Sequence, residues 1–233
     1  MELTFASYNI RKAIGLDRKR DPERIVAILR ELDADVIALQ EADRRIGSRS
    51  AAVPRVLLDD TKWRPLPIAM RPRSIGWHGN ALLVRRDIEV AQCDPVALPT
   101  LEPRGAVCAE LSLDGRPFRV IGAHLDISGI RRRDQIRAIL RHVAASATRC
   151  PTVLMGDFNQ WGLRTGAMTE FGDGWQLLLP GRSFHARRPV AYLDRIVATE
   201  AWQVAGTGVH HSALSARGSD HLPIWARLGL PEL

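Results

Sequence analysis

The chain has 233 residues, of which 45% are hydrophobic and 25% charged, and this is the composition of a soluble globular protein with a sizeable core. It contains neither an apolar run near the roughly 18 to 20 residues that cross a bilayer nor a secretory signal at its N-terminus, so we expect a cytoplasmic protein without a membrane segment. The formal charge is +7, but the 30 arginines and three lysines are scattered along the sequence, so the charge favours anionic partners without selecting nucleic acid.

The first half of the chain alternates strand-like and helical segments. Residues 3–10 read as a strand, and Asp21-Pro22 then opens a helix with an N-cap followed by proline. The apolar positions of this helix recur at intervals of three and four, which predicts one buried face. Residues 35–39 predict a buried strand, and residues 52–58 predict a short helix.

The second half is richer in strands. Asp114-Gly115 separates two apolar runs and predicts a tight hairpin. The further strands are expected at 80–84, 106–113, 118–123, 152–155, 195–198 and 222–228, and a second amphipathic helix at 131–147. No repeat, linker or composition shift divides the chain, so residues 1–233 predict one layered α/β domain. Cys93, Cys108 and Cys150 match neither a disulfide framework nor a metal-binding pattern, so we expect reduced thiols.

Polar side chains stand at the ends of these strands. GDFN, residues 156–159, follows the apolar run 151–155, and alone it is more typical of an ordinary turn than of a reaction centre. Similar polar groups end or begin five other strands. The residues concerned are Asn9, Glu41, His124, Asp157, Asn159, Asp194, Asp220 and His221. If these strand ends converge, they form one polar pocket.

The residue types in this pocket fit the hydrolysis of a phosphate ester. Glu41, Asp220 and Asn9 offer the oxygen donors that Mg²⁺ and Mn²⁺ prefer. An imidazole backed by a carboxylate serves as a base or as a stabilising cation. A metal, donors to the phosphoryl oxygens and a proton acceptor are what attack by water requires.

The ordered motifs resemble the endonuclease/exonuclease/phosphatase superfamily, and most closely its short bacterial hydrolases. The resemblance runs from residue 7 to about residue 227. The motifs are Ser-Tyr-Asn9, Leu-Gln-Glu41, His-Gly-Asn80, Glu-Pro-Arg104, Ala-His124, Gly-Asp157-Phe-Asn159, Leu-Asp194-Arg-Ile and Ser-Asp220-His221. The resemblance implies a four-layer α/β sandwich with two mixed β-sheets packed face to face and helices on the outer faces.

The resemblance also implies a role for each motif residue. Asn9, Glu41 and Asp220 would hold Mg²⁺ or Mn²⁺, while Asp157 and Asn159 would position the attacking water and the phosphoryl group. His221, oriented by Asp194, would be a general base or a cationic stabiliser, and the choice of Asp157 or His221 as proton acceptor stays open. His124 would donate to a phosphoryl oxygen, Arg104 would contact the phosphate, and Asn80 would bind substrate.

At two positions this sequence differs from the motifs of the abasic-site endonucleases, and these differences narrow the class of substrate that we expect. Those enzymes carry Tyr-Val-Pro-Asn where this chain has His124-Leu-Asp-Ile, and an Asp where it has Arg11. The chain therefore resembles the branch of nucleases, sphingomyelinases and small bacterial phosphodiesterases more than the DNA-repair members. The leading hypothesis is a metal-dependent hydrolase of phosphate esters, and specifically a phosphodiesterase, whose substrate is a phospholipid head group, a small phosphodiester or nucleic acid. A nuclease is the second hypothesis, and a catalytically inactive anion-binding module is the third. No obligate protein partner is indicated.

Further arginines and tryptophans are expected near the active-site rim. Two readings stay open for the arginines, contact with an anionic substrate or a solvated loop. They are Arg44, Arg45, Arg49, Arg71 and Arg73. Trp77 and Trp161 either stack on a base or border a lipid pocket, or they pack in the core. His210 and His211 are expected on the surface.

Overall fold

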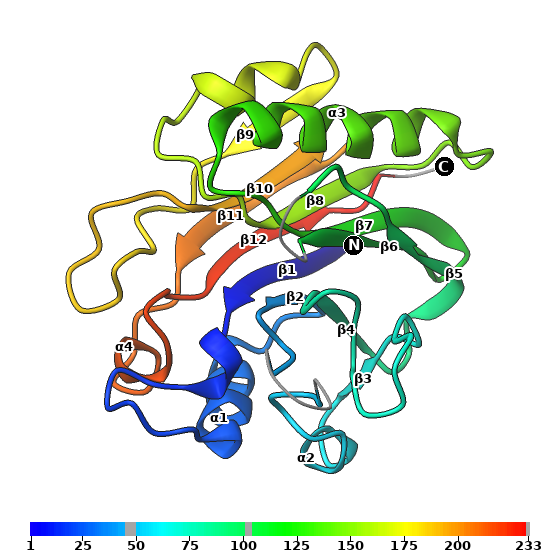
Figure 1. Ribbon diagram of the computed structural model, residues 1–233. Coiled ribbons are helices and arrows are strands. Elements are labelled where there is room, and N and C mark those ends of the chain that lie inside the picture. Colours follow the sequence, from blue (N-terminus) through cyan, green and yellow to red (C-terminus); the bar gives the residue numbers. More distant parts are fainter. Residues whose placement is uncertain (45–49, 101–103, 232–233) are drawn as a thin grey trace.

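The computed structural model describes residues 1–44, 50–100 and 104–231, and it consists of two six-stranded sheets that pack face to face (Figure 1). The first sheet has the strand order β11-β12-β1-β2-β4-β3. Its strands are β1 (Glu2–Asn9), β2 (Val36–Gln40), β3 (Trp63–Pro65), β4 (Ala81–Arg85), β11 (Gln203–Val209) and β12 (Ile224–Gly229).

The second sheet has the strand order β5-β6-β7-β8-β10-β9. Its strands are β5 (Glu89–Val96), β6 (Gly105–Leu113), β7 (Arg116–His124), β8 (Thr152–Asp157), β9 (Trp175–Leu178) and β10 (Asp194–Thr199). Each sheet contains one parallel pair, β1 with β2 and β7 with β8, and its other pairs are antiparallel. Both sheets are therefore mixed, as the family resemblance implies.

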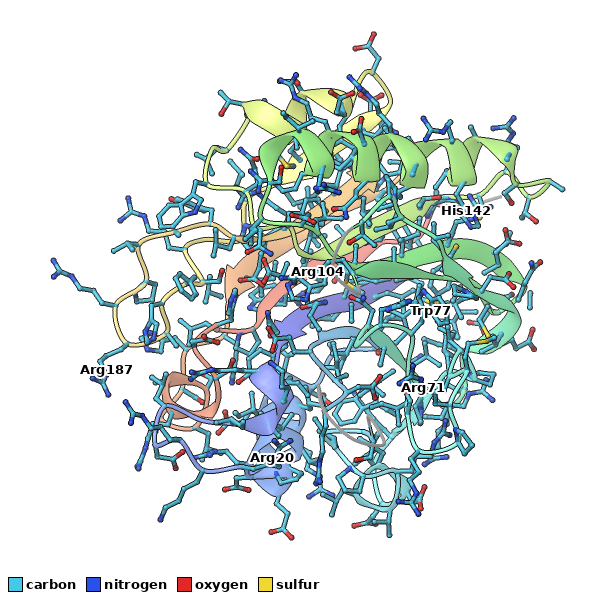
Figure 2. All side chains as sticks on the ribbon, viewed as in Figure 1. Arg20, Arg71, Trp77, Arg104, His142 and Arg187 are labelled. Carbon is cyan, nitrogen blue, oxygen red and sulfur yellow. The ribbon has the colours of Figure 1, made fainter. Side chains whose placement is uncertain are left out.

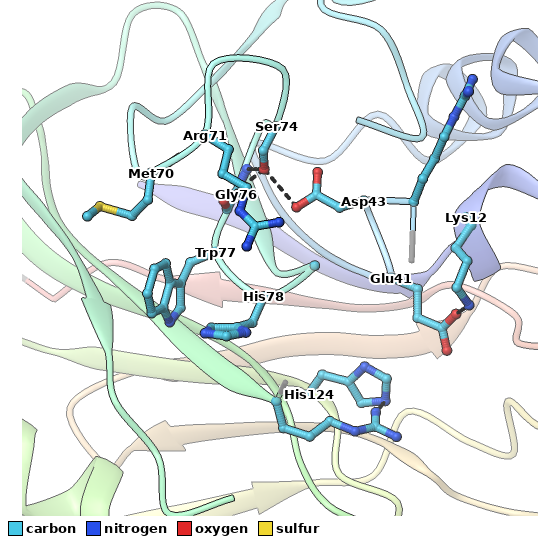
Figure 3. A pocket seen from close by; sticks show the side chains of 13 residues that line it. Lys12, Glu41, Asp43, Met70, Arg71, Ser74, Gly76, Trp77, His78 and His124 are labelled. Carbon is cyan, nitrogen blue, oxygen red and sulfur yellow. Dashed lines mark hydrogen bonds and ion pairs between the residues drawn. The ribbon is translucent and has the colours of Figure 1, made fainter. Parts of the chain in front are cut away.

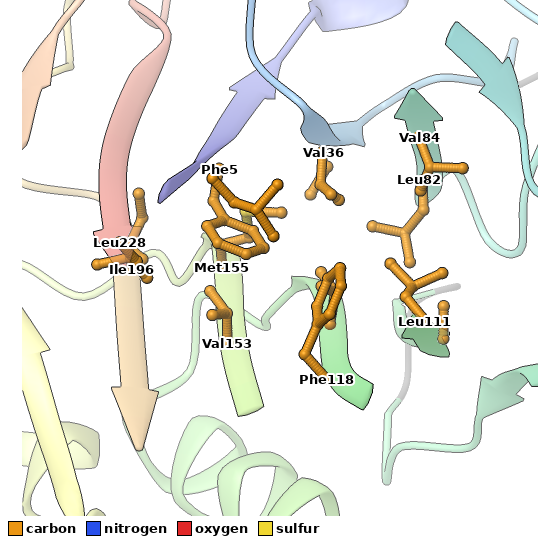
Figure 4. Close-up of a cluster of buried hydrophobic side chains, with 14 of the residues drawn as sticks. Phe5, Val36, Leu82, Val84, Leu111, Phe118, Val153, Met155, Ile196 and Leu228 are labelled. Carbon is orange, nitrogen blue, oxygen red and sulfur yellow. The ribbon is translucent and has the colours of Figure 1, made fainter. Parts of the chain in front are cut away.

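The main hydrophobic core lies between the two sheets (Figure 4). Phe5 of the first sheet packs edge-on against Phe118 of the second, with ring centroids 6.1 Å apart. Trp202 meets Phe5 in the same manner at 5.2 Å. Edge-to-face aromatic pairs of this kind add about 0.5–1.5 kcal/mol each beyond the burial of their area. The interlocking rings thus fix the two sheets against each other.

Helices cover the two outer faces and complete the four layers (Figure 1). Helix α1 (Pro22–Leu32) begins at Asp21, whose side chain accepts a hydrogen bond from Arg24 N at 2.9 Å, and it buries its apolar face on the first sheet. Helix α3 (Gly129–Ala145) covers the second sheet with Ile136 and Ile139. The shorter helical segments are η1 (Arg11–Ala13), α2 (Val56–Asp59), η2 (Gly166–Glu170) and α4 (Ser215–Gly218). No helix in the described part of the chain is both long enough and apolar enough to span a membrane.

Two local predictions have different outcomes. The Asp114-Gly115 hairpin is confirmed, since both residues take positive φ values, 51° and 75°, in the turn between β6 and β7. The helix expected over 52–58 is wrong at its start, because α2 begins only at Val56. The segment before it consists of bends tied to the loop after β2: Ala52 N donates to Ala42 O at 2.7 Å, and Ala51 forms a bridge with Asp43.

Candidate active site

One row of polar residues crosses neighbouring strands of the second sheet. The register places Asp194 of β10 opposite Asp157 of β8, and Asp157 opposite His124 of β7. Side chains directly opposite each other on paired strands lie on the same face. Gly156 permits the close approach of β7 and β8, because a Cβ atom there would lie 1.8 Å from Ala123 O. The glycine of GDFN thus brings Asp157 against His124.

The first sheet supplies the opposite wall of the site. Asn9 ends β1, and the parallel register pairs it with Gln40, so Glu41 follows at the same edge. The side chain of Asn9 donates from Nδ2 to Asp157 Oδ2 at 3.0 Å, which joins the two sheets. Ser219 Oγ donates to Asn9 O at 2.7 Å and so holds the segment that carries Asp220. The strand ends therefore converge across the sandwich.

His221 and Asp194 form a buried pair at the centre of this arrangement. Nδ1 of His221 lies 2.8 Å from Asp194 Oδ2, and Ser183 Oγ donates to the same carboxylate oxygen. Nε2 of His221 points towards Asp157, 3.7 Å from its Oδ2 atom. A carboxylate at Nδ1 fixes the orientation of the ring and leaves Nε2 for chemistry.

The two site histidines have opposite pKa shifts. Burial opposes a charge on His221, but the carboxylates of Asp194 and Asp157 outweigh it and raise its pKa to about 10. Burial, supported by the nearby Arg104 guanidinium, lowers the pKa of His124 to about 3 despite the proximity of Asp157. The site thus holds one imidazolium and one neutral imidazole, as different surroundings dictate.

The raised pKa of His221 predicts a pH-dependent stability. From 6.5 in the unfolded chain the pKa rises to about 10 in the fold. The stabilisation is therefore complete below pH 6.5 and is lost as pH rises through about 10. Urea unfolding in EDTA should show the largest gap between wild type and His221→Gln near about pH 6 and the smallest near about pH 10.5. A gap that does not change with pH would contradict the charged state of this histidine.

A cleft of about 450 Å³ opens beside these residues (Figure 3). Lys12 pairs with Glu41 on one side, and Arg104 contacts Nε2 of His124 at the base. Arg71 points into the cleft opposite them (Figure 3). The lining residues are Lys12, Glu41, Asp43, Arg44, Met70, Arg71, Ser74, Gly76, Trp77, His78, Gly79, Arg104 and His124. Four lysine or arginine side chains against two acidic ones suit an anionic ligand.

The turn after β1 is conformationally strained. Arg11, Lys12 and Ala13 have φ values of 46°, 59° and 60°, and Glu41 has a φ of 51°. Such residues cost about 1 to 3 kcal/mol each and persist at functional sites. This strained turn brings two basic side chains to two carboxylates. Lys12 pairs with Glu41, and Arg11 Nε lies 3.5 Å from Asp220 Oδ2.

Two groups of acidic and histidine residues are candidates for a metal-binding site, and their surroundings differ. Ligand atoms of Asp157, Asp194 and His221 lie within 4.8 Å of one another, but His221 is engaged by Asp194 and carries a proton, so this group suits proton transfer better. Glu41 and Asp220 each attract a basic side chain, and their oxygen atoms are donors that Mg²⁺ and Mn²⁺ accept. The contacts among the described residues do not join Glu41 directly to Asn9 or Asp220.

Three residues predicted to contact substrate or water have distinct surroundings. Asn80 is 1% exposed, and its Nδ2 donates to Gly105 O at 3.0 Å, so it supports the cleft wall from behind. Asn159 Nδ2 donates to Leu125 O at 2.9 Å, and its backbone N–H donates to Asp157 Oδ1 at the same distance. Of these three predicted residues, only Arg104 lines the cleft.

Sequence reasoning missed Lys12 and assigned no role to Ser183. Lys12 lies three residues after Asn9, so its closeness to a strand end was the available signal. Ser183 is 11 residues before Asp194 and gives no local signal of its contact with that carboxylate. Arg44 and Arg71 line the cleft and Arg73 is exposed. Arg45 and Arg49 lie outside the described residues.

Three comparisons place this arrangement among known proteins. The model of the Endonuclease/Exonuclease/phosphatase family matches residues 6–221. The protein YbhP of Escherichia coli (strain K12), described as uncharacterized, is 27% identical over 227 residues, which cover 87% of this chain and 86% of YbhP. Two solved structures share the fold. They are the mannosyl-6-phosphatase Bt3783 of Bacteroides thetaiotaomicron (TM-score 0.78, 17% identity, 98% of this chain and 100% of that one) and D. rerio TDP2 in complex with a single-strand DNA product (TM-score 0.75, 15% identity, 98% and 99%).

Proposed function

Since the chain belongs to the endonuclease/exonuclease/phosphatase family, we propose that it is a divalent-metal-dependent hydrolase of phosphate esters, and specifically a phosphodiesterase. The observation that carries the proposal is the buried His221–Asp194 pair, which faces Asp157 beside a cleft with an excess of basic side chains. An inactive anion-binding module would not require this proton-transfer group, so the complete set of polar residues favours an enzyme.

Each part of the reaction has a candidate residue. Mg²⁺ or Mn²⁺ held by Asn9, Glu41 and Asp220 would neutralise charge on the phosphoryl oxygens. Asp157 orients a water molecule for in-line attack and takes its proton, while the neighbouring His221 imidazolium stabilises the negative charge that develops. Asp194 keeps Nε2 of His221 directed at this water throughout.

The remaining residues bind the phosphate. Arg104 lies at the base of the cleft, in contact with His124, and its guanidinium is a strong donor to phosphoryl oxygens. Arg104 can only donate, so in this contact Nε2 of His124 accepts and Nδ1 carries the proton. The Asn159 carboxamide, anchored on Leu125 O, stands beside Asp157 and positions the group under attack.

A nuclease is the second candidate for the substrate class. D. rerio TDP2, which shares the fold, was solved with a single-strand DNA product, whereas Bt3783 is a mannosyl-6-phosphatase. The fold therefore serves different phosphate esters, and loops decide among them. The positive charge supports a nucleic acid, but a cleft of about 450 Å³ suits a small ligand or one nucleotide better than duplex DNA.

The test compares phosphate esters with and without metal. We expect bis-p-nitrophenyl phosphate to be hydrolysed in Mn²⁺ faster than p-nitrophenyl phosphate, and turnover to stop in EDTA. Turnover that persists in EDTA, or none at all with Mn²⁺, would contradict the proposed enzyme. Nicking of supercoiled plasmid that is lost in Asp157→Asn would favour the nuclease instead.

A further inference from the structure

Three large apolar side chains are exposed together at the rim of the site. The exposed fraction is 71% for Ile127, 77% for Ile130 and 64% for Trp161. We call these three residues the apolar rim. Single exposed apolar residues are ordinary on a protein surface, whereas a group beside a functional site marks an interaction surface.

The apolar rim lies on the loop after β7, the first turn of α3 and the loop after β8, and these segments are tied to each other. The buried side chain of Arg132 donates to Ile127 O at 2.6 Å and to Gln160 Oε1 at 3.2 Å, next to Trp161. One loop follows β7 and His124, and the other follows β8 and Asn159. The N-terminus of α3 lies on the side of the molecule where β1 ends at Asn9 (Figure 1). The rim is thus a fixed extension of the two strands that carry the site.

Exposed basic side chains lie on the same loop as Trp161 and on the loop beside Asp220. Arg164 and Arg187 are exposed, and among the described residues neither pairs with a carboxylate. Arg187 projects from the body of the molecule (Figure 2), on a loop held at the site by a bond from Ala186 N to Asp220 O at 2.7 Å. The acidic residues of these loops are not available to offset this charge, because Asp126 is buried and Asp220 pairs with Arg11.

We infer that the apolar rim docks the protein onto the surface of an anionic lipid bilayer. Isoleucine partitions into the acyl region, tryptophan favours the interface, and exposed arginines bind anionic head groups. A single-stranded nucleic acid would find only one stacking surface here, Trp161, because aliphatic side chains offer no flat ring to a base. Two aliphatic side chains in a group of three therefore favour lipid.

Docking in this orientation sets the strand ends against the head groups. The cleft would then meet phosphodiesters that stand at the membrane surface, while the outer face of the sandwich carrying α2 stays in water. This consequence for the substrate rests on the proposed function. The docking itself needs neither metal nor turnover, so it is tested separately.

The experiment measures vesicle binding in EDTA. Wild type is sedimented with vesicles of phosphatidylcholine alone and with vesicles that contain phosphatidylglycerol, beside the triple variant Ile127→Ser, Ile130→Ser, Trp161→Ser. The control is Val56→Ser on α2, because Val56 is 70% exposed but lies away from the site. We expect binding to the anionic vesicles, weakened about tenfold or more in the triple variant and unchanged in the control.

A second readout follows Trp161 itself. The difference in emission between wild type and Trp161→Phe should shift to shorter wavelength on anionic vesicles, since the indole leaves water. Binding that the triple variant retains would overturn the inference, and so would the absence of vesicle binding. Retention of an oligothymidylate that depends on Trp161 but not on the isoleucines, without vesicle binding, would assign the rim to single-stranded nucleic acid instead.

Discussion

Replacement of His221 with alanine should lower kcat for bis-p-nitrophenyl phosphate by about 10²- to 10⁴-fold, the usual contribution of a positioned acid–base group. Nε2 of His221 lies 3.7 Å from Asp157, and no other imidazole in the described part of the chain bonds to Asp194. Asp194→Asn should also lower kcat, because an amide at this position neither charges the ring nor fixes its tautomer. The measurement is initial rate against substrate concentration with saturating Mn²⁺.

The matched control is His210→Ala. His210 also contacts a carboxylate, Glu31 at 2.9 Å, but at the surface and away from the cleft. Its replacement should leave kcat unchanged. If His221→Ala retains wild-type kcat while circular dichroism confirms its fold, the catalytic role proposed for this histidine is wrong.

Replacement of Glu41 with glutamine should weaken Mn²⁺ binding by at least about 10- to 100-fold, because even the outer partners of a metal site contribute this much. Glutamine keeps the shape of Glu41 and removes the charge that now attracts Lys12. Calorimetric titration with Mn²⁺ in the absence of substrate measures the affinity directly. The turnover number should fall in parallel when Mn²⁺ is limiting.

The control for the metal prediction is Glu89→Gln, which removes an equal charge from the exposed start of β5. It should bind Mn²⁺ as the wild type does. Equal Mn²⁺ affinities for Glu41→Gln and wild type would exclude Glu41 as a ligand. The group formed by Asp157, Asp194 and His221 would then become the alternative metal site.

The central strands of both sheets could be predicted from the sequence, but the edges could not. Strands β2 and β8 are buried at every position, since the inter-sheet core covers one face and helices the other. The four strands that the sequence did not reveal are β3, β5, β9 and β11, and each lies at a sheet edge. Strand β5 is largely exposed, and β11 contains two glycines and no fully buried residue. Edge strands form through pairing with a neighbour, which leaves little apolar pattern to detect.

Site residues that lie at the ends of strands could be predicted from the sequence. Asn9, His124, Asp157 and Asp194 are the first or last residues of their strands, so a polar side chain after an apolar run identified them. Contacts that depend on a loop were not accessible. The strained turn that carries Lys12 to Glu41 and the path that brings Ser183 to Asp194 follow from tertiary packing alone.

The pairing of β1 with β12 has a consequence for synthesis of the protein. Glu2 lies opposite Gly229, so β1 pairs early with β2 but acquires its antiparallel neighbour β12 only after all the other strands have been made. The second sheet, by contrast, is encoded without interruption between β5 and β10. It can assemble while the first sheet still lacks β11 and β12. The candidate site, which includes both Asn9 and His221, is therefore completed only after every strand of the second sheet has been made.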